Sequence, residues 1–151
     1  MKTGSIYKIK NKGYIIFGSS TTVGGFSIAS EPFINIPEDK VNSDIIANAI
    51  KASLCNDDTK KVPDPTNWPE FNKKFLQNIG LKSLKELDSP TTKCVSISEN
   101  KGEIFFLPTR PAPKPDKGFL HKNQADGVAV PTAASNQEII VAYELSLSRC
   151  G

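Results

Sequence analysis

The feature that most constrains the fold of this chain is a pattern that occurs twice in its 151 residues. The segment INIPEDKVNSDIIANAI, from Ile34 to Ile50, returns in a looser form as VAVPTAASNQEIIVAYE, from Val128 to Glu144. A true duplication carries its neighbouring elements with it, so the surrounding residues decide whether the match is more than chance. The two copies share, at an offset of 94, Pro37 with Pro131, Asn42 with Asn136, Asp44 with Glu138, and Ile45-Ile46 with Ile139-Ile140.

The segment before each copy has the pattern of a β-hairpin. Asn11-Lys12-Gly13 and Asn100-Lys101-Gly102 each stand between two runs of alternating apolar residues. Alternation gives a strand one buried face, and glycine supplies the positive φ of a tight turn. A Gly-Phe pair follows each hairpin, at Gly25-Phe26 and at Gly118-Phe119. The second half carries about five extra residues by this alignment. They fall in Pro108–Lys117, which is too rich in proline to be expected as a central strand.

Each copy ends in an amphipathic helix with a well-marked start. Asn42 or Ser43 in the first copy, and Ser135 or Asn136 in the second, can accept a hydrogen bond from the first helical turn. Apolar residues then recur at helical spacing, which predicts that one face of each helix packs on a sheet. The two predicted stripes are Ile45, Ile46, Ala49, Ile50 and Leu54, and Ile139, Ile140, Tyr143 and Leu147.

A segment without a counterpart separates the two copies. Asn56–Glu70 is polar and interrupted by prolines, so we expect a surface connection that ends at a helix start. Trp68 begins a helical pattern that continues through Phe71, Phe75 and Leu76, and Gly80 would end that helix as a C-cap. A second short helix is expected at Lys82–Leu87. Trp68 is expected to pack over this insert, because a lone tryptophan with apolar neighbours at such spacing is more often a core residue than a binding platform.

These patterns together predict an α+β fold in a single domain, residues 1–151. It would contain two pseudo-symmetric antiparallel sheet-plus-helix repeats, about 5–55 and 93–150, with a helical insert at about 56–90 between them. A chain of this length can bury roughly two-thirds of its unfolded surface, so it needs no disulfide or metal to fold. No apolar run is long enough for a signal peptide or a membrane span, which favours a cytoplasmic location. Three cysteines without a CxxC motif (Cys55, Cys94 and Cys150) are expected to be reduced.

The sequence offers little from which a catalytic site could be built. His121 is its only histidine, and no nucleophile lies near it in the sequence, so we expect a solvated side chain. Several histidines or cysteines at ligand spacing would be needed for a metal site. Gly24-Gly25 lacks the frame of a phosphate-binding loop and is better read as a turn. We therefore expect a protein that is not an enzyme and that has no catalytic, cofactor-binding or metal-binding residues.

The second half of the chain resembles a known family in its motifs. Lys82-Ser83 stands before a short helix, a hairpin leads into Leu107-Pro108, a Gly-Phe pair follows, and the closing helix ends in a cysteine. With these motifs, Gly80–Pro111, Gly118–Pro131 and Ser135–Cys150 resemble the contact-dependent growth inhibition (CDI) immunity proteins of Gram-negative bacteria.

The resemblance implies a cytoplasmic, monomeric protein that binds one cognate toxin domain and blocks it. The toxin would be the C-terminal part, often a nuclease, of a large surface-exposed effector that neighbouring cells deliver. Some members of the family look like the Whirly fold, in which a four-stranded sheet plus helix (ββββα) occurs twice. The repeat predicted above matches that plan, although fold alone does not give function.

A second function class follows from the same fold. Whirly-like sheets can bind single-stranded nucleic acid, and a net charge of +3, from 19 basic and 16 acidic residues, does not exclude it. Such binding uses a basic groove with exposed aromatic rings, whereas most aromatic residues here are needed by the sheet faces. The best remaining candidate is Pro108–Lys122, with Arg110, Lys114, Lys117 and Lys122.

The charge distribution suggests where a toxin would bind. Glu31–Glu70 contains eight acidic residues and four lysines, whereas Met1–Ser30 contains four lysines and no acidic residue. A nuclease presents a basic cleft to its substrate, and an inhibitor that fills this cleft benefits from a negative surface. The alternative is an ordinary solvated face, which is what charge runs usually form. The predicted toxin-binding residues are Glu31, Glu38, Asp39, Asp57, Asp58 and Asp64.

Overall fold

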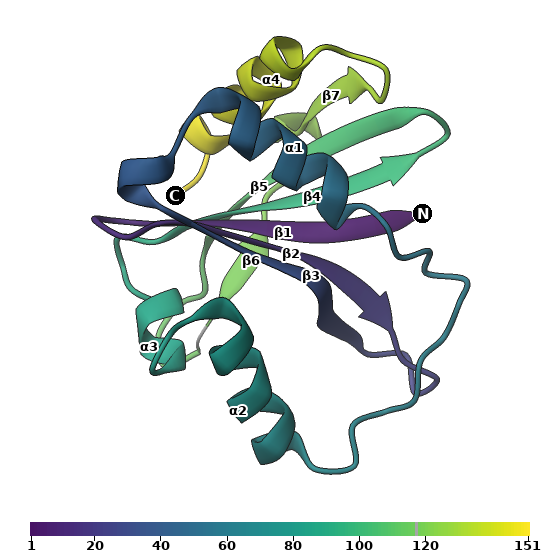
Figure 1. Cartoon of the computed structure of the whole chain (residues 1–151), viewed down its shortest axis with the longest axis vertical. Helices are drawn as coiled ribbons and strands as arrows, with labels where there is room; N and C mark the ends of the chain where they lie inside the picture. The colour runs from purple at the N-terminus through teal and green to yellow at the C-terminus, as the bar shows by residue number, and fades with distance from the viewer. Residues whose placement is uncertain (117) are drawn as a thin grey trace.

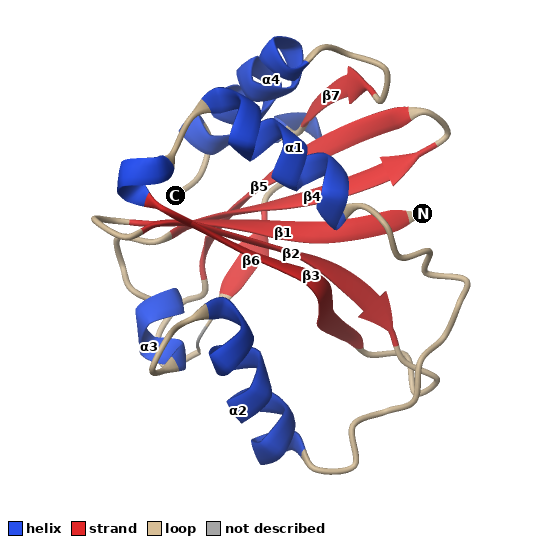
Figure 2. Ribbon diagram, in the orientation of Figure 1, coloured by secondary structure: helices blue, strands red, loops and turns tan. Residues whose placement is uncertain are grey.

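The chain folds around one antiparallel β-sheet that has helices on both of its faces (Figure 1). A computed structural model describes residues 1–116 and 118–151. The strand order is β3-β2-β1-β4-β5-β6, and β7 also pairs with β5 (Figure 2). The predicted α+β class is confirmed. In chain order, the elements are β1 (Lys2–Ile9), β2 (Gly13–Thr21), β3 (Ser27–Pro37), η1 (Glu38–Lys40), α1 (Ser43–Ser53), α2 (Trp68–Ile79), α3 (Leu84–Leu87), β4 (Lys93–Asn100), β5 (Glu103–Pro111), β6 (Phe119–His121), η2 (Gln124–Asp126), β7 (Val128–Pro131) and α4 (Asn136–Ser148).

Both hairpins turn at the Asn-Lys-Gly motifs, but their loops differ in length. Between β4 and β5 only Lys101 (φ 51°) and Gly102 (φ 79°) separate the paired ends. Two successive residues with positive φ are what a two-residue type I′ turn requires. Between β1 and β2 the loop is one residue longer, and the positive φ values belong to Asn11 (64°) and Gly13 (114°). The same motif therefore makes two different turns.

The helices α1 and α4 begin as predicted, and the structure identifies the residue that caps each. The side chain of Asn42 accepts a first-turn N–H of α1 at 2.9 Å. The Ser135 hydroxyl accepts the N–H of Glu138 at 3.2 Å, and the Glu138 side chain completes a capping box. Asn136, the alternative cap, instead joins the two helices, because its side-chain oxygen accepts a hydrogen bond from Lys51 Nζ at 2.8 Å.

The buried faces of α1 and α4 match at an offset of 93 rather than 94. The buried residues are Ile46, Ala47, Ala49, Ile50 and Ser53 in α1, and Ile139, Ile140, Ala142, Tyr143 and Ser146 in α4. The prediction that Ile45 lies on the buried stripe is wrong, since it is 41% exposed while Ile139 is fully buried. One residue turns a helix by about 100°, which is enough to move a side chain off the sheet. The matching faces favour the predicted duplication, which stays a prediction.

The two halves differ in their strands. Four strands were expected before each helix, but only three precede α1, whereas four precede α4. The reason is that β3 stays one strand through a register shift at Glu31-Pro32, while in the second half η2 separates the two short strands β6 and β7. Both of these pair with β5, at Thr109–Pro111 and at Glu103–Phe106 respectively. The ββββα description therefore does not hold for the first half.

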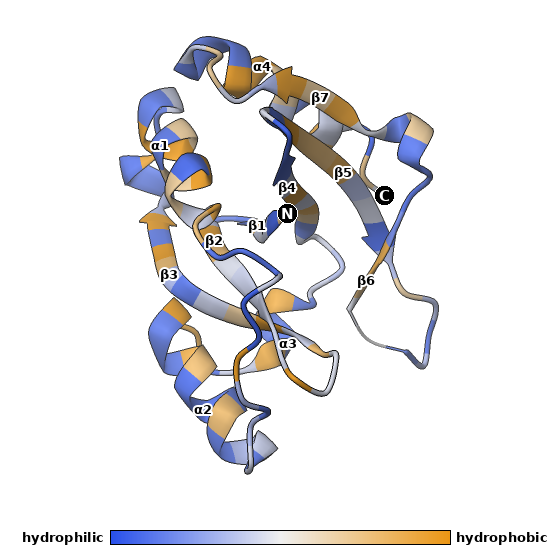
Figure 3. Cartoon of the chain, turned by 90° about the vertical axis from the view of Figure 1, so that its right-hand side faces the viewer, coloured by the Kyte–Doolittle hydropathy of each residue, from blue (hydrophilic) through white to orange (hydrophobic). Residues whose placement is uncertain are grey.

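The sheet separates the apolar side chains into two cores, and helices cover one core on each face (Figure 3). The larger core lies under α1 and α4 and includes Ile6, Phe106 and Tyr143. The smaller core lies under α2 and α3 and includes Phe17 and Ile79. Asn67, which the sequence analysis did not single out, caps the start of α2, and Gly80 ends the helix at φ 74° as predicted. In the described ranges, no helix is both long and apolar enough to cross a membrane.

Part of the proline-rich stretch lies inside the sheet, so the expectation that it avoids a central strand is wrong. Pro108 belongs to β5 and pairs with Val95 of β4. The Pro108 carbonyl accepts a hydrogen bond from the N–H of Lys122, on the side of β6 and β7. Because the nitrogen and the carbonyl of one strand residue point to the same side, the Pro108 nitrogen also faces β6 and β7. No β6 or β7 residue pairs with Pro108 itself, which lies in the gap between those two strands. The missing N–H therefore costs the ladder no hydrogen bond.

Candidate partner-binding surfaces

The acidic residues predicted to bind a toxin do not form one surface. Glu31 and Glu38 are seven positions apart along an extended backbone, which corresponds to about 20 Å. The connection between α1 and α2 crosses the end of the sheet opposite η1, because Lys2 bridges to Asp57 and Thr22 to Val62. The role of the six acidic residues in toxin binding stays a prediction. By position, Glu38 and Asp39 lie in η1, Glu31 lies in β3, and Asp57, Asp58 and Asp64 lie in the connection.

The three acids of the connection also have structural partners. The carboxylates of Asp57 and Asp58 lie 3.7 and 3.0 Å from the Met1 amine. The carboxylate of Asp64 accepts the backbone N–H of Gly24 at 3.2 Å and so ties the connection to the β2–β3 turn. These exposed ion pairs contribute little stability, and the carboxylates stay accessible to a partner.

A lysine-lined hollow of 490 Å³ lies at the η1 end of the sheet, and no sequence pattern predicted it. Lys8 and Lys93 lie directly opposite each other on β1 and β4, and Lys10 follows in the β1–β2 turn. The Lys8 ammonium lies 5.9 Å from the centre of the Tyr14 ring, a cation–π contact. Like charges opposite each other weaken a strand pair. Glu38 also lines the hollow, so three lysines and one carboxylate surround it, and this excess of positive charge favours an anionic group.

The basic stretch predicted for nucleic acid is divided between sheet and loop. Arg110 is exposed at the end of β5, and Lys114 is exposed in the loop that follows. Lys117 lies outside the described residues. Lys122 donates from Nζ to the backbone carbonyl of Arg149, next to the end of α4. One of these four cations is therefore partly used to hold the C-terminal end of the chain.

Groups with potential chemistry meet at two places, where His121 contacts Ser96 and where the Cys150 thiol donates to the Cys94 carbonyl at 3.4 Å. His121 is exposed as expected, and its Nε2 lies 2.7 Å from the Ser96 hydroxyl on β4. All three cysteines are free. Burial raises the pKa of the Cys94 thiol to about 12, so this thiol is protonated at neutral pH and is not an activated nucleophile. Within residues 1–116 and 118–151, no group of His, Cys, Asp and Glu side chains could hold a metal ion.

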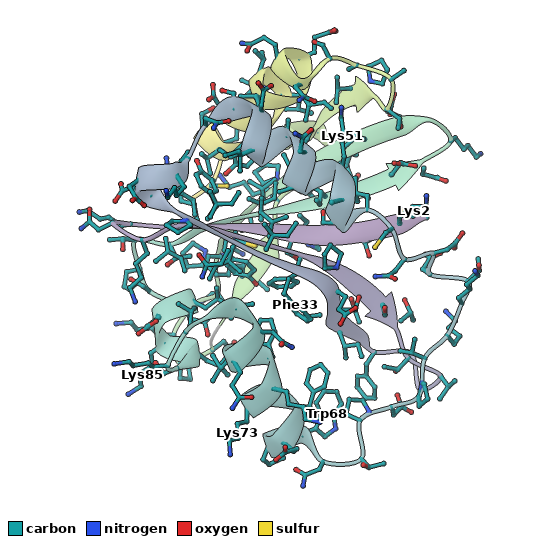
Figure 4. The ribbon with its side chains drawn as sticks, in the orientation of Figure 1. Lys2, Phe33, Lys51, Trp68, Lys73 and Lys85 are labelled. Atoms are coloured by element: carbon teal, nitrogen blue, oxygen red, sulfur yellow. The ribbon has the colours of Figure 1, made fainter. Side chains whose placement is uncertain are left out.

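Exposed apolar side chains gather where the β2–β3 turn meets the start of α2, and we call this group the aromatic patch. It consists of the exposed side chains of Val23, Phe26 and Trp68 and the half-buried ring of Phe71. The Trp68 ring lies edge-on to both phenylalanines, at centroid distances of 5.9 Å to Phe26 and 5.7 Å to Phe71. Trp68 packs on Phe71 of the helical insert as predicted, but it is 42% exposed, so the expectation of a core side chain is wrong. Figure 4 shows it pointing from α2 towards the β2–β3 hairpin, with Lys73 on the other side of the helix.

Comparison with known proteins gives a likeness of fold. No protein-family model matches the chain, and no curated protein matches it. One similar solved structure is the Protein of Unknown Function NMB0488 from Neisseria meningitidis. It is 19% identical with a TM-score of 0.69, and the alignment covers 99% of this chain and 95% of that one.

A second similar structure is a chain of the CdiA-CT/CdiI toxin and immunity complex from Yersinia pseudotuberculosis. It is also 19% identical, with a TM-score of 0.62, and the alignment covers 99% of this chain and 97% of that chain. The whole chain therefore has the fold of a protein found in a toxin–immunity complex. At this identity the likeness concerns the fold alone.

Proposed function

We propose that this chain is an immunity protein that binds and neutralises the cognate C-terminal toxin domain of a CDI effector. The observation that carries the proposal is the likeness to a chain of a toxin and immunity complex over almost the full length of both chains. The motifs of Gly80–Cys150 resemble those of CDI immunity proteins, and this sequence resemblance is independent of the likeness in fold. An immunity protein acts by occupying a surface of its toxin, so it requires a binding face and no catalytic group.

We further propose that the toxin is a nuclease and that the protein acts as a cytoplasmic monomer. The toxin would meet the end of the sheet that carries Asp57, Asp58 and Asp64, together with Glu31 on the neighbouring strand. Glu38 and Asp39 would contribute only if the toxin also reached the η1 end. A negative surface accelerates association with a basic nuclease cleft and excludes other partners. This part of the proposal rests on charge.

Coexpression tests the proposed function directly. We expect the reading frame immediately upstream of this chain to encode a large effector protein. The C-terminal domain of that protein is expressed in bacteria from an inducible promoter, with and without the chain. We expect growth to stop with the domain alone and to be restored by the chain, while the chain alone leaves growth normal. Growth arrest by the chain alone would make it a toxin, and arrest that the chain does not relieve would contradict immunity.

One observation favours a second candidate function, binding of single-stranded nucleic acid. Lys8, Lys10 and Lys93 meet around a hollow that has the Tyr14 ring on its wall. Gel shifts with single-stranded oligonucleotides at rising salt concentration test it. Tight binding that weakens steeply with salt would favour this function, because phosphate contacts release counterions. We expect no such binding, since the Tyr14 ring is buried and cannot stack on a base.

A further inference from the structure

We propose that the aromatic patch, Val23, Phe26, Trp68 and Phe71, is the apolar centre of the toxin-docking surface. The inference rests on the proposed immunity function and adds to it the place of contact. Val23 is 69% exposed and Phe26 is 56% exposed. Single exposed apolar residues are common, but an exposed tryptophan in ring contact with two phenylalanines, with Val23 in the same turn as one of them, is typical of a protein interface.

The turn that presents the patch is held firmly from both sides. Within the turn, the Thr22 hydroxyl accepts the N–H of Phe26 at 3.0 Å, and the Thr22 N–H donates to the Phe26 carbonyl at 2.8 Å. From outside, the N–H of Val23 donates to the carbonyl of Val62 at 2.9 Å, and Asp64 accepts the N–H of Gly24. A surface that is ordered before binding loses little conformational entropy when its partner arrives.

The charges beside the patch indicate what kind of partner covers it. The connection that holds the turn carries Asp57, Asp58 and Asp64 against two lysines, and Glu70 lies between Trp68 and Phe71 in α2. Lys73 lies on the far side of that helix (Figure 4). An apolar centre beside an acidic segment complements a partner that has an apolar group within a basic surface. A nuclease toxin domain fits this description.

The test compares matched variants in calorimetric titrations with the upstream-encoded C-terminal domain in a catalytically inactive form. Phe26→Ser and Trp68→Ser remove the patch side chains. Val141→Ser and Leu145→Ser on the outer side of α4 are the controls, because these residues are similarly exposed, at 56% and 44%. We expect each patch variant to weaken binding by at least about 10-fold, the range of an interface hot spot, and each control to bind like the wild type.

The outcomes separate the inference from the function on which it rests. Wild-type affinity in both patch variants would overturn the inference while immunity stands. Absence of binding by the wild-type chain, together with failure to restore growth, would overturn both. Equal unfolding midpoints for patch and control variants show that the fold is intact. If light scattering showed a wild-type dimer that Trp68→Ser converts to a monomer, a second copy of this chain would cover the patch, and the inference would fall.

Discussion

Replacing Gly13 or Gly102 by alanine gives two closely related changes whose costs should differ. Both glycines end an Asn-Lys-Gly motif and both have positive φ. At Gly102, with φ 79°, an added Cβ meets nothing within 4 Å, so the substitution costs only the strain of a left-handed residue, about 1 kcal/mol. At Gly13, with φ 114°, the Cβ would lie 2.1 Å from the Ile36 carbonyl oxygen and 2.8 Å from the Glu38 nitrogen. Because both atoms are backbone, the β2–β3 pairing must shift.

We therefore expect Gly13→Ala to cost about 3 to 5 kcal/mol, as for other changes that combine overpacking with backbone strain. Urea unfolding followed by circular dichroism measures both variants. With a slope of about 2 kcal/mol per molar urea, the midpoint should fall by about 0.5 M for Gly102→Ala and by about 2 M for Gly13→Ala. Similar midpoints for the two variants would show that the first turn is not packed against β3 as described, and would refute the reasoning.

Five further expectations concern the core, the thiols and the surface. Ile46→Ala should destabilise the fold by about 2 to 4 kcal/mol in urea unfolding, whereas Ile45→Ala should stay within about 0.5 kcal/mol, since only Ile46 is buried. When the native protein is treated with iodoacetamide at pH 8, mass spectrometry should find the exposed Cys55 alkylated and the buried Cys94 unmodified. The Cys94 thiol ionises more readily in the unfolded chain than in the folded protein, so the free energy of unfolding should fall as pH rises from 9 towards 12. The Cys94→Ala variant should lose less stability over the same pH range. Reversing Asp57 and Asp58 to lysine should weaken toxin binding in calorimetry more than reversing Lys114 and Lys117 to glutamate; the opposite order would assign binding to the basic loop. Growth protection should survive His121→Ala, and its loss in a stably folded variant would give the histidine a chemical role.

Local signals in the sequence predicted much of the fold. The hairpin turns, the cap at Asn42 and the end of α2 at Gly80 each depend on a few neighbouring residues. The register of the repeat was missed by one residue. Asn42, the N-cap of α1, comes five positions after Pro37, whereas Ser135, the N-cap of α4, comes only four positions after Pro131. A deletion in a loop leaves no periodic signal, so an alignment anchored on the prolines places the second helix one residue out of register.

The candidate surfaces were harder to predict because they depend on contacts between distant segments. Lys8 and Lys93 become neighbours only because β1 pairs with β4. Trp68 has the spacing of a core residue, and its exposure follows from where α2 meets the β2–β3 turn. The available signal for the aromatic patch was the pair Val23 and Phe26, which stand three positions apart in a glycine turn flanked by polar residues. Helical periodicity alone could not separate a core tryptophan from an interface tryptophan.

The central claim is that this chain neutralises a toxin by binding it, and an inhibition titration tests that claim most directly. The purified C-terminal domain encoded upstream is assayed for degradation of cellular nucleic acid while the purified chain is added in increasing amounts. We expect the activity to fall linearly and to reach zero at about one equivalent of the chain. This is the behaviour of a complex whose Kd lies well below the protein concentrations used. Undiminished activity in the presence of excess folded chain would contradict the central claim.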